Sequence, residues 1–198
     1  MQIENNKEEV PFSYYADLFS KADPSEITAR LGIPFENGAF TVTLLGNSYT
    51  IPHPVAEDAQ FAPALPIQTF LLRYLLEAKE VSWNGEWKTF REMPWGELYI
   101  KPYTGRVLTR AAFTFGMKVE KFRAACEKLG ATALPHGDAG FEFDFIGGYK
   151  IRILVWAADE EFPPNAQILY SENFATGFAA EDRVVAGDIL ITHIKSAM

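Results

Sequence analysis

Residues 141–155 constrain the fold most strongly, because their side chains alternate in character with a period of two. In residues 141–145 three phenylalanines alternate with two carboxylates, and aliphatic residues at 151, 153 and 155 continue the period. Between them, Gly147-Gly148 is typical of a tight turn. A period of two belongs to a strand with one buried face. The sequence therefore predicts an antiparallel hairpin whose buried face is aromatic on its first strand.

Two further segments show the same period. Residues 40–44 alternate apolar side chains with threonines, and Gly46-Asn47 leads into a short strand at 48–51, which predicts a second hairpin. Residues 167–170 predict one more strand. The strands are therefore expected to pair mainly with antiparallel neighbours.

Apolar residues at helical spacing predict the remaining elements. One start is marked by Asp23 as a cap, Pro24 at the first helical position and Glu26 three residues beyond the cap, and Gly32 suits its end. The predicted helices cover residues 11–22, 24–32, 67–78, 106–115, 119–129 and 181–194. Residues 81–103 have no sustained period, which predicts loops and short strands.

These elements favour an α+β fold with a mainly antiparallel sheet and packed amphipathic helices. At 198 residues the chain is long enough for one domain. We expect a flexible N-terminus over residues 1–9 and a single domain over 10–198.

Charge and composition exclude several classes of partner. The net charge is −8 and the basic residues are scattered, so neither nucleic acid nor a membrane surface is an expected partner. The polar N-terminus is unlike a signal peptide, which predicts a soluble, acidic, cytoplasmic protein. The single Cys126 predicts no disulfide and fits a buried, apolar role. Phosphate-loop, dinucleotide and nucleophile-elbow motifs are absent, and no cofactor or metal is predicted.

The acidic run Asp159-Glu160-Glu161 follows Trp156 and ends at Phe162-Pro163-Pro164. Adjacent carboxylates can hold a hard cation, or keep one acid protonated beside an ionised neighbour. The alternative is a solvated acidic turn at the sheet edge. Asp138, two residues after His136, is a second candidate that also fits an ordinary turn.

The aromatic residues of 83–103 offer a third candidate. They could line a ligand pocket in which Arg91 or Lys101 holds an anionic group, or they could be ordinary core packed beneath loops.

Several motifs together resemble one known family. They are Leu71-Leu72-x-Tyr74-Leu75, Gly85-x-Trp87-x-x-Phe90-Arg91-Glu92-x-Pro94-x-Gly96, Gly137-Asp138, Trp156-x-x-Asp159-Glu160-Glu161-Phe162-Pro163 and Ile168-Leu169-Tyr170. The pattern resembles the bacterial and archaeal domain of unknown function 3786, over nearly the whole chain. This chain departs from it at Ala157-Ala158, where relatives tend to have glycine before the aspartate, and at Ser171, where many have aspartate.

The resemblance implies a metabolic context for the protein and does not imply a specific activity. Members of that family come largely from anaerobes, and some resemble fusions to a cysteine-rich iron–sulfur module like that of corrinoid one-carbon proteins. The resemblance therefore implies a link to such proteins in anaerobic metabolism, although this chain lacks the cysteine-rich module.

Three functions follow as hypotheses. The first is a non-enzymatic ligand-binding or accessory domain for a small molecule or a protein, and its predicted rim residues are Arg91, Asp138, Trp156, Asp159, Glu160 and Glu161. The second is a hydrolase or lyase that uses carboxylates, with Mg²⁺ or Ca²⁺. The third is a homo-oligomeric interaction protein whose aromatic residues form the interface.

Overall fold

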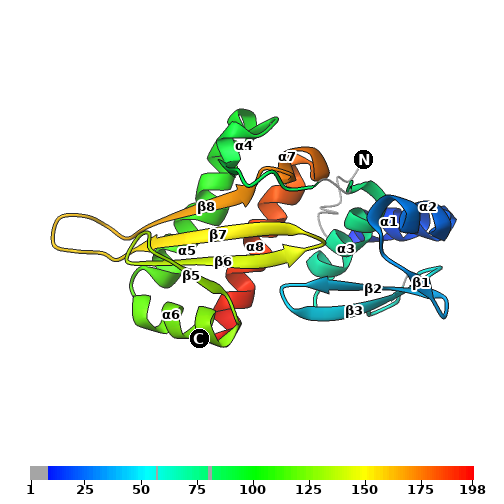
Figure 1. The fold of residues 1–198 in the computed structure, drawn as a ribbon, viewed down its shortest axis with the longest axis horizontal. Helices are drawn as coiled ribbons and strands as arrows, with labels where there is room; N and C mark the ends of the chain where they lie inside the picture. The colour runs from blue at the N-terminus through cyan, green and yellow to red at the C-terminus, as the bar shows by residue number, and fades with distance from the viewer. Residues whose placement is uncertain (1–8, 57, 80–81) are drawn as a thin grey trace, which may run out of the picture. The chain divides into compact units, whose positions relative to one another are not determined.

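A computed structural model describes residues 9–56, 58–79 and 82–198, with side chains from Phe12 onward (Figure 1). The chain forms two compact units, Met1–Glu80 and Val81–Met198. The predicted flexible segment, residues 1–9, lies outside the described residues except for Glu9, where the first helix begins. The single domain predicted over residues 10–198 stays a prediction.

The first unit packs helices against a small antiparallel sheet. Its elements are α1 (Glu9–Lys21), α2 (Pro24–Leu31), β1 (Phe35–Glu36), β2 (Ala39–Leu44), β3 (Asn47–Pro52) and α3 (Leu65–Glu77). Strands β2 and β3 form the predicted hairpin, with Phe40 opposite Ile51 and both side chains fully buried. Strand β1 pairs with β2 on its other side.

The helix start predicted at Asp23 is confirmed. The Asp23 carboxylate accepts hydrogen bonds from the Ser25 hydroxyl and from the Ser25 backbone N–H, both of 2.8 Å, and these two bonds lower the pKa of Asp23. Gly32 ends the helix at φ 67°, in the left-handed conformation expected of it. Arg30 then donates to the carbonyls of Leu75 and Ala78, so the end of α2 also satisfies the end of α3.

The second unit begins with β4 and a long helical run. Its elements are β4 (Trp87–Thr89), a 3₁₀ turn (Phe90–Glu92), α4 (Gly96–Tyr103), a π-helical segment (Thr104–Thr109), α5 (Arg110–Phe115), α6 (Val119–Lys128), β5 (Thr132–Leu134), β6 (Ala139–Ile146), β7 (Tyr149–Trp156), β8 (Asn165–Ser171), α7 (Phe174–Gly177) and α8 (Ala180–Ala197). The five strands pair antiparallel in the order β5-β6-β7-β8-β4. This confirms the α+β class and the antiparallel sheet.

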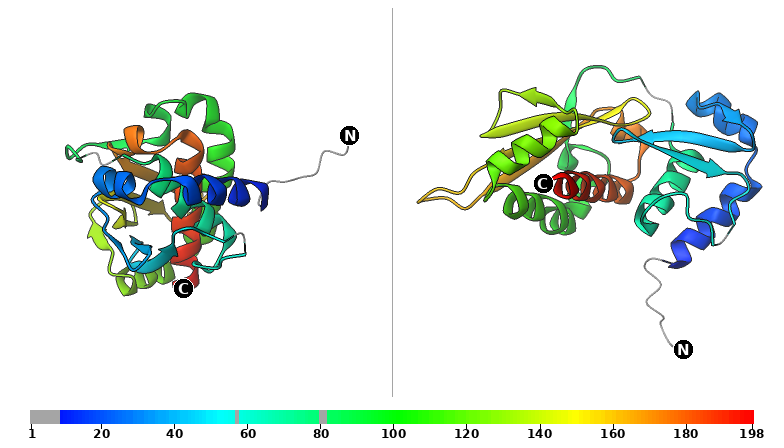
Figure 2. Two further views of the ribbon diagram at one scale, coloured as in Figure 1. Left: turned by 90° about the vertical axis from the view of Figure 1, so that its right-hand side faces the viewer. Right: turned by 90° about the horizontal axis from the view of Figure 1, so that it is seen from below.

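The predicted aromatic hairpin lies at the centre of this sheet. Phe141 and Phe143 on β6 face Ile153 and Ile151 on β7, and all four side chains are buried. Helix α6 contacts β6, α5 contacts β7 and β8, and α8 packs on α6 and on the π-helical segment. The second view in Figure 2 shows α5, α6 and α8 on one face of the sheet.

The opposite face of the sheet carries paired charges beneath a tryptophan. Glu142 lies between Lys150 and Arg152 of the neighbouring strand, at 3.1 Å and 2.9 Å. The Arg152 guanidinium lies 3.9 Å from the centre of the Trp87 ring. The polar residues of the alternating pattern therefore form a partly buried ion-pair network. Two tryptophans of the 83–103 segment contact it, because the Trp83 ring centre also lies 5.7 Å from the Lys150 ammonium.

Residues 81–103 differ from the prediction of loops and short strands, because they also contain helix α4. Gly96 at its start and Pro102 within it are weak helix formers. Its apolar side chains Leu98 and Tyr99 are exposed, so the pattern of a buried helical face is missing. In the part of the chain that the structure describes, no helix is long and apolar enough to cross a membrane.

Candidate functional site

Helix α4 carries the most exposed aromatic surface of the second unit. Trp95, Leu98 and Tyr99 are 72%, 71% and 42% exposed, and together they are called the α4 surface below. Beside them lies an open depression of about 710 Å³, the α4 depression. It is lined by Arg91, Glu97, Leu98, Ile100, Lys101 and Thr104.

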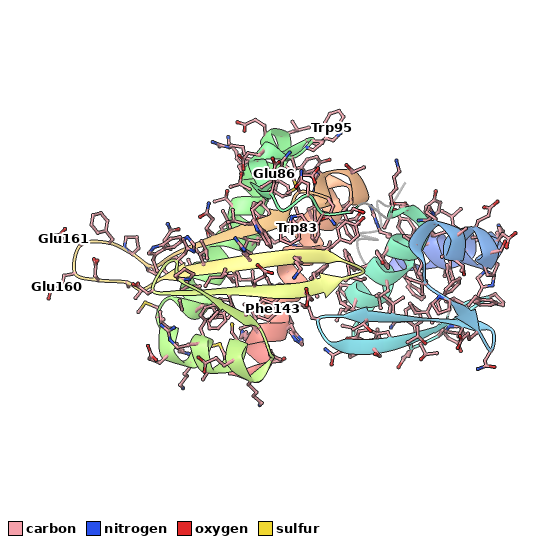
Figure 3. All side chains as sticks on the ribbon, in the orientation of Figure 1. Trp83, Glu86, Trp95, Phe143, Glu160 and Glu161 are labelled. Carbon is pink, nitrogen blue, oxygen red and sulfur yellow. The ribbon has the colours of Figure 1, made fainter. Side chains whose placement is uncertain are left out.

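Trp95 has a left-handed backbone, at φ 64° and ψ 1°. This region costs an L-residue with a bulky side chain about 1–2 kcal/mol. Such strain persists only where neighbouring structure enforces it, and it is concentrated at functional sites. Burial of the indole does not offset this strain energy, because most of the Trp95 side chain is exposed to solvent (Figure 3).

Gly96 helps to impose that conformation. A β-carbon at this position would lie 2.0 Å from the carbonyl oxygen of Phe90, so only glycine fits. The Gly96 N–H donates to the Met93 carbonyl at 2.9 Å, which closes the turn before α4. The chain therefore folds back tightly between Phe90 and Gly96, with Trp95 on its outer side.

A buried polar cluster supports the inner side of the same turn. Arg183, 1% exposed on α8, donates to the Pro94 carbonyl, and burial lowers its pKa. Phe90 and Tyr103 stack with their ring centres 3.9 Å apart. The Tyr103 and Tyr170 hydroxyls are 3.2 Å apart, and that of Tyr170 donates to the Arg183 carbonyl at 2.9 Å. Burial raises the pKa of both tyrosines.

Local hydrogen bonds position Arg91 at the depression. The Glu92 carboxylate accepts from the Thr89 backbone N–H and the Thr89 hydroxyl, both at 2.7 Å, and these bonds lower the pKa of Glu92. This capping box fixes the short 3₁₀ turn that contains Arg91. Arg91 forms an ion pair of 3.0 Å with Glu97, and both side chains are largely exposed. Arg91 and Lys101 therefore border one depression, although none of the residues that line it is aromatic, and the binding of an anionic ligand there stays a prediction.

The acidic run lies elsewhere, at the tip of the β7–β8 hairpin (Figures 1 and 3). Residues 159–163, called the hairpin tip below, are all exposed, and Phe162 is 65% exposed. The Asp159 carboxylate accepts from the backbone N–H groups of Glu161 and Phe162, at 2.8 Å and 2.7 Å. Asp159 thus shapes the turn, while Glu160 and Glu161 extend into solvent.

Asp138 belongs to the base of this hairpin. Its carboxylate accepts from the Ala157 N–H at 2.7 Å, and its own N–H donates to the Val155 carbonyl at 2.9 Å. Trp156 is half-buried at the end of β7, opposite Asn165. Asp138 and Trp156 therefore lie close together, and their role as rim residues stays a prediction.

The six predicted site residues fall into separate groups along the second unit. Arg91 lies beside α4, Asp138 and Trp156 lie at the base of the hairpin, and Asp159, Glu160 and Glu161 lie at its tip. Among the described residues, no three His, Cys, Asp or Glu side chains are grouped as metal ligands would be.

The sequence analysis included Trp95 and Tyr99 only among the aromatic residues of 83–103 that could line a pocket, and it did not place Trp95, Leu98 or Tyr99 among the six predicted rim residues. The signal that could have identified them is Pro94-Trp95-Gly96, in which a bulky aromatic residue stands where the chain must turn. Cys126 is fully buried as predicted, and burial raises the pKa of its thiol far above the usual range.

Comparison with known proteins gives one match. The family model described as a domain of unknown function, DUF3786, matches residues 23–193. No curated protein and no solved structure shows a significant match. The matched range includes the turn before α4, the α4 depression and the hairpin tip.

Proposed function

The chain belongs to the family of the domain of unknown function DUF3786, and we propose that this member is a non-enzymatic binding domain. Its ligand would be an anionic group that also carries an aromatic or apolar part. The α4 surface would hold the apolar part, and Arg91 and Lys101 would face the negative charge.

The observation that carries this proposal is the conformation of Trp95. The turn holds residue 95 in a left-handed conformation that glycine would adopt without strain, and a tryptophan there that is 72% exposed contributes little to the core, so its presence is best explained by what the indole contacts in a complex. Tryptophan is also among the residues most enriched at binding hot spots. The α4 depression is lined by two cations and one carboxylate, in a chain of net charge −8, and this favours an anionic ligand over a cationic one.

The carboxylate-enzyme hypothesis has less support than the binding hypothesis. The three carboxylates of the acidic run are exposed, and the Asp159 carboxylate is occupied by two backbone N–H groups. A general acid or base usually works in a pocket that excludes water. The acidic run therefore fits a recognition element better than a catalytic pair.

The test uses Trp95→Gly, which should separate folding from binding. Glycine adopts φ 64° without strain, and this gain of about 1–2 kcal/mol opposes the entropy of about 0.5–1 kcal/mol that glycine adds to the unfolded chain. We therefore expect the free energy of unfolding, measured by urea denaturation, to stay within about 1 kcal/mol of the parent value or to rise.

The probe is anilinonaphthalene sulfonate, an aromatic anion whose fluorescence rises in apolar sites. Trp95→Gly and Lys101→Glu should each weaken its binding to dilute protein by about tenfold or more, because each removes one half of the proposed contact. Phe113→Ala is the matched control, since Phe113 is an exposed aromatic residue (59%) away from the α4 depression. Equal dye binding by all four proteins would contradict the proposal.

A further inference from the structure

The hairpin tip combines negative charge with an exposed aromatic ring, which are the two features proposed for a ligand of the α4 depression. It presents two free carboxylates, Glu160 and Glu161, directly beside Phe162, whose ring is 65% exposed. Asp159 fixes this arrangement through its hydrogen bonds to the backbone N–H groups of Glu161 and Phe162. An exposed aromatic ring next to negative charge is thus held at the end of a projecting hairpin.

The tip cannot reach the α4 depression of its own chain. Both belong to the second unit, and Figure 3 shows Glu160 and Glu161 at one end of it and Trp95 at another. A contact between the two surfaces therefore requires a second copy of the chain. From this complementarity of charge and apolar exposure, and resting on the proposed function, we propose that the hairpin tip of one copy docks in the α4 depression of another.

The exposed apolar area indicates how many such contacts are needed. Large aromatic side chains bury roughly 150–250 Å² each, so one docked tip covers well under the ~800 Å² per partner of a stable interface. Two reciprocal contacts reach that order, because each copy then contributes Phe162 as well as Trp95, Leu98 and Tyr99. A closed dimer with a two-fold axis makes both contacts at once.

Charge favours this pairing over contact between like surfaces. The depression combines Arg91 and Lys101 with Glu97, which leaves one net positive charge, whereas the tip carries three carboxylates. Tip against tip would place carboxylates together, and opposing like charges are strongly unfavourable at an interface.

The experiment measures molar mass by light scattering after size exclusion, over a concentration series of the full chain. The parent protein should approach the mass of a dimer as its concentration rises. The tip variant Glu160→Lys/Glu161→Lys and the depression variant Arg91→Glu/Lys101→Glu should each dimerise about 100-fold more weakly, because each places like charges in both contacts.

Mixing the two variants tests directly whether the hairpin tip of one copy docks in the α4 depression of another. In the mixed dimer the lysines of one tip face the glutamates of one depression, and the unaltered tip faces the unaltered depression, so dimerisation should return. The control Lys128→Glu/Lys195→Glu makes the same change in net charge as the depression variant, at exposed positions of other helices, and should still dimerise.

Three outcomes would overturn the docking proposal: a monomeric parent at every concentration, variants that dimerise like the parent, or a mixture that stays monomeric. The dye experiment separates this failure from a failure of the proposed function. Dye binding that depends on Trp95 in a monomeric parent would refute docking between copies and leave the binding site in place. Dye binding that ignores Trp95 would refute the site itself.

Discussion

At the scale of single residues, the turn before α4 depends on glycine at position 96. The Phe90 carbonyl oxygen occupies the space that a β-carbon would need, and Gly96 also follows the left-handed Trp95. A methyl group there would have to push two backbone segments apart, and backbone yields less readily than a flexible side chain.

Gly96→Ala should therefore destabilise the protein by about 1–3 kcal/mol, the usual cost of overpacking. Gly105→Ala is the matched control, because the space around its β-carbon is open and it lies in a helical segment. Alanine there should raise stability by up to about 1 kcal/mol. Urea denaturation monitored by far-UV circular dichroism measures both changes. Equal effects of the two substitutions would show that the close contact with Phe90 does not govern the turn.

At the scale of elements, the hairpin tip is held by hydrogen bonds of one residue, Asp159. Its carboxylate accepts from the Glu161 and Phe162 N–H groups, and its own backbone N–H donates to the Phe162 carbonyl at 3.0 Å. The strands beneath it are paired from Ile151↔Tyr170 to Trp156↔Asn165, and they do not depend on the tip. The tip should therefore loosen without unfolding the sheet.

Asp159→Ala should lower the free energy of unfolding by about 1–1.5 kcal/mol, because the native loop loses hydrogen bonds that the unfolded chain does not make, while the sheet stays folded. The amide protons of Glu161 and Phe162 should exchange at least about tenfold faster with solvent, since each loses a hydrogen-bond partner worth about 1–1.5 kcal/mol. Hydrogen exchange followed by NMR measures this, with Glu160→Ala as the control that leaves both bonds in place. Unchanged exchange in Asp159→Ala would mean that the loop is ordered by other contacts.

Elements with a buried face were the ones that the sequence predicted well. The period of two in 141–155 and 40–44 reflects one covered face of a sheet, and the Asp23 cap reflects a local hydrogen bond, so both could be inferred from residue spacing. Helix α4 could not, because its apolar side chains Leu98 and Tyr99 lie on the exposed side and only Gly96 and Tyr103 are buried. The aromatic residues of 83–103 and the cations Arg91 and Lys101 were named as a candidate site, but their placement on an exposed helix was not predicted.

The grouping of the candidate residues depended on tertiary structure. Arg91 and Lys101 are ten positions apart, and they meet at one depression only because residues 90–96 turn back and α4 follows. Asp138 meets Ala157 only because β6 and β7 pair in the register that places Ala139 opposite Val155. A local sequence pattern gives no spatial distance between residues that are far apart in the chain. The sequence could therefore name these residues, but it could not show which of them are neighbours.

At the scale of the whole molecule, net charge opposes the association that the local charges favour. Two copies at −8 each repel at long range, whereas the contacts between hairpin tip and α4 depression act over a few ångströms. Each reversal of a charge changes the net charge by two, so the tip variant carries −4 and the depression variant −12. Their mixed dimer has the same total charge as the parent dimer, which isolates the local contact from the global repulsion.

Salt should therefore affect dimerisation in two opposite ways. At about 10 mM ionic strength the screening length is ~30 Å, so repulsion between the two acidic copies is felt fully and dimerisation should be weak. At about 0.15 M the screening length is ~8 Å, which removes most of the long-range repulsion and leaves the close contacts, so affinity should rise. Near 1 M the exposed ion pairs are screened as well, and affinity should fall unless apolar burial dominates. Sedimentation equilibrium across this range measures the dimer dissociation constant. A constant that falls steadily with salt would show that Phe162 and the α4 surface carry the contact without Arg91 and Lys101, whereas a minimum at intermediate salt is the result expected if charge selects the partner.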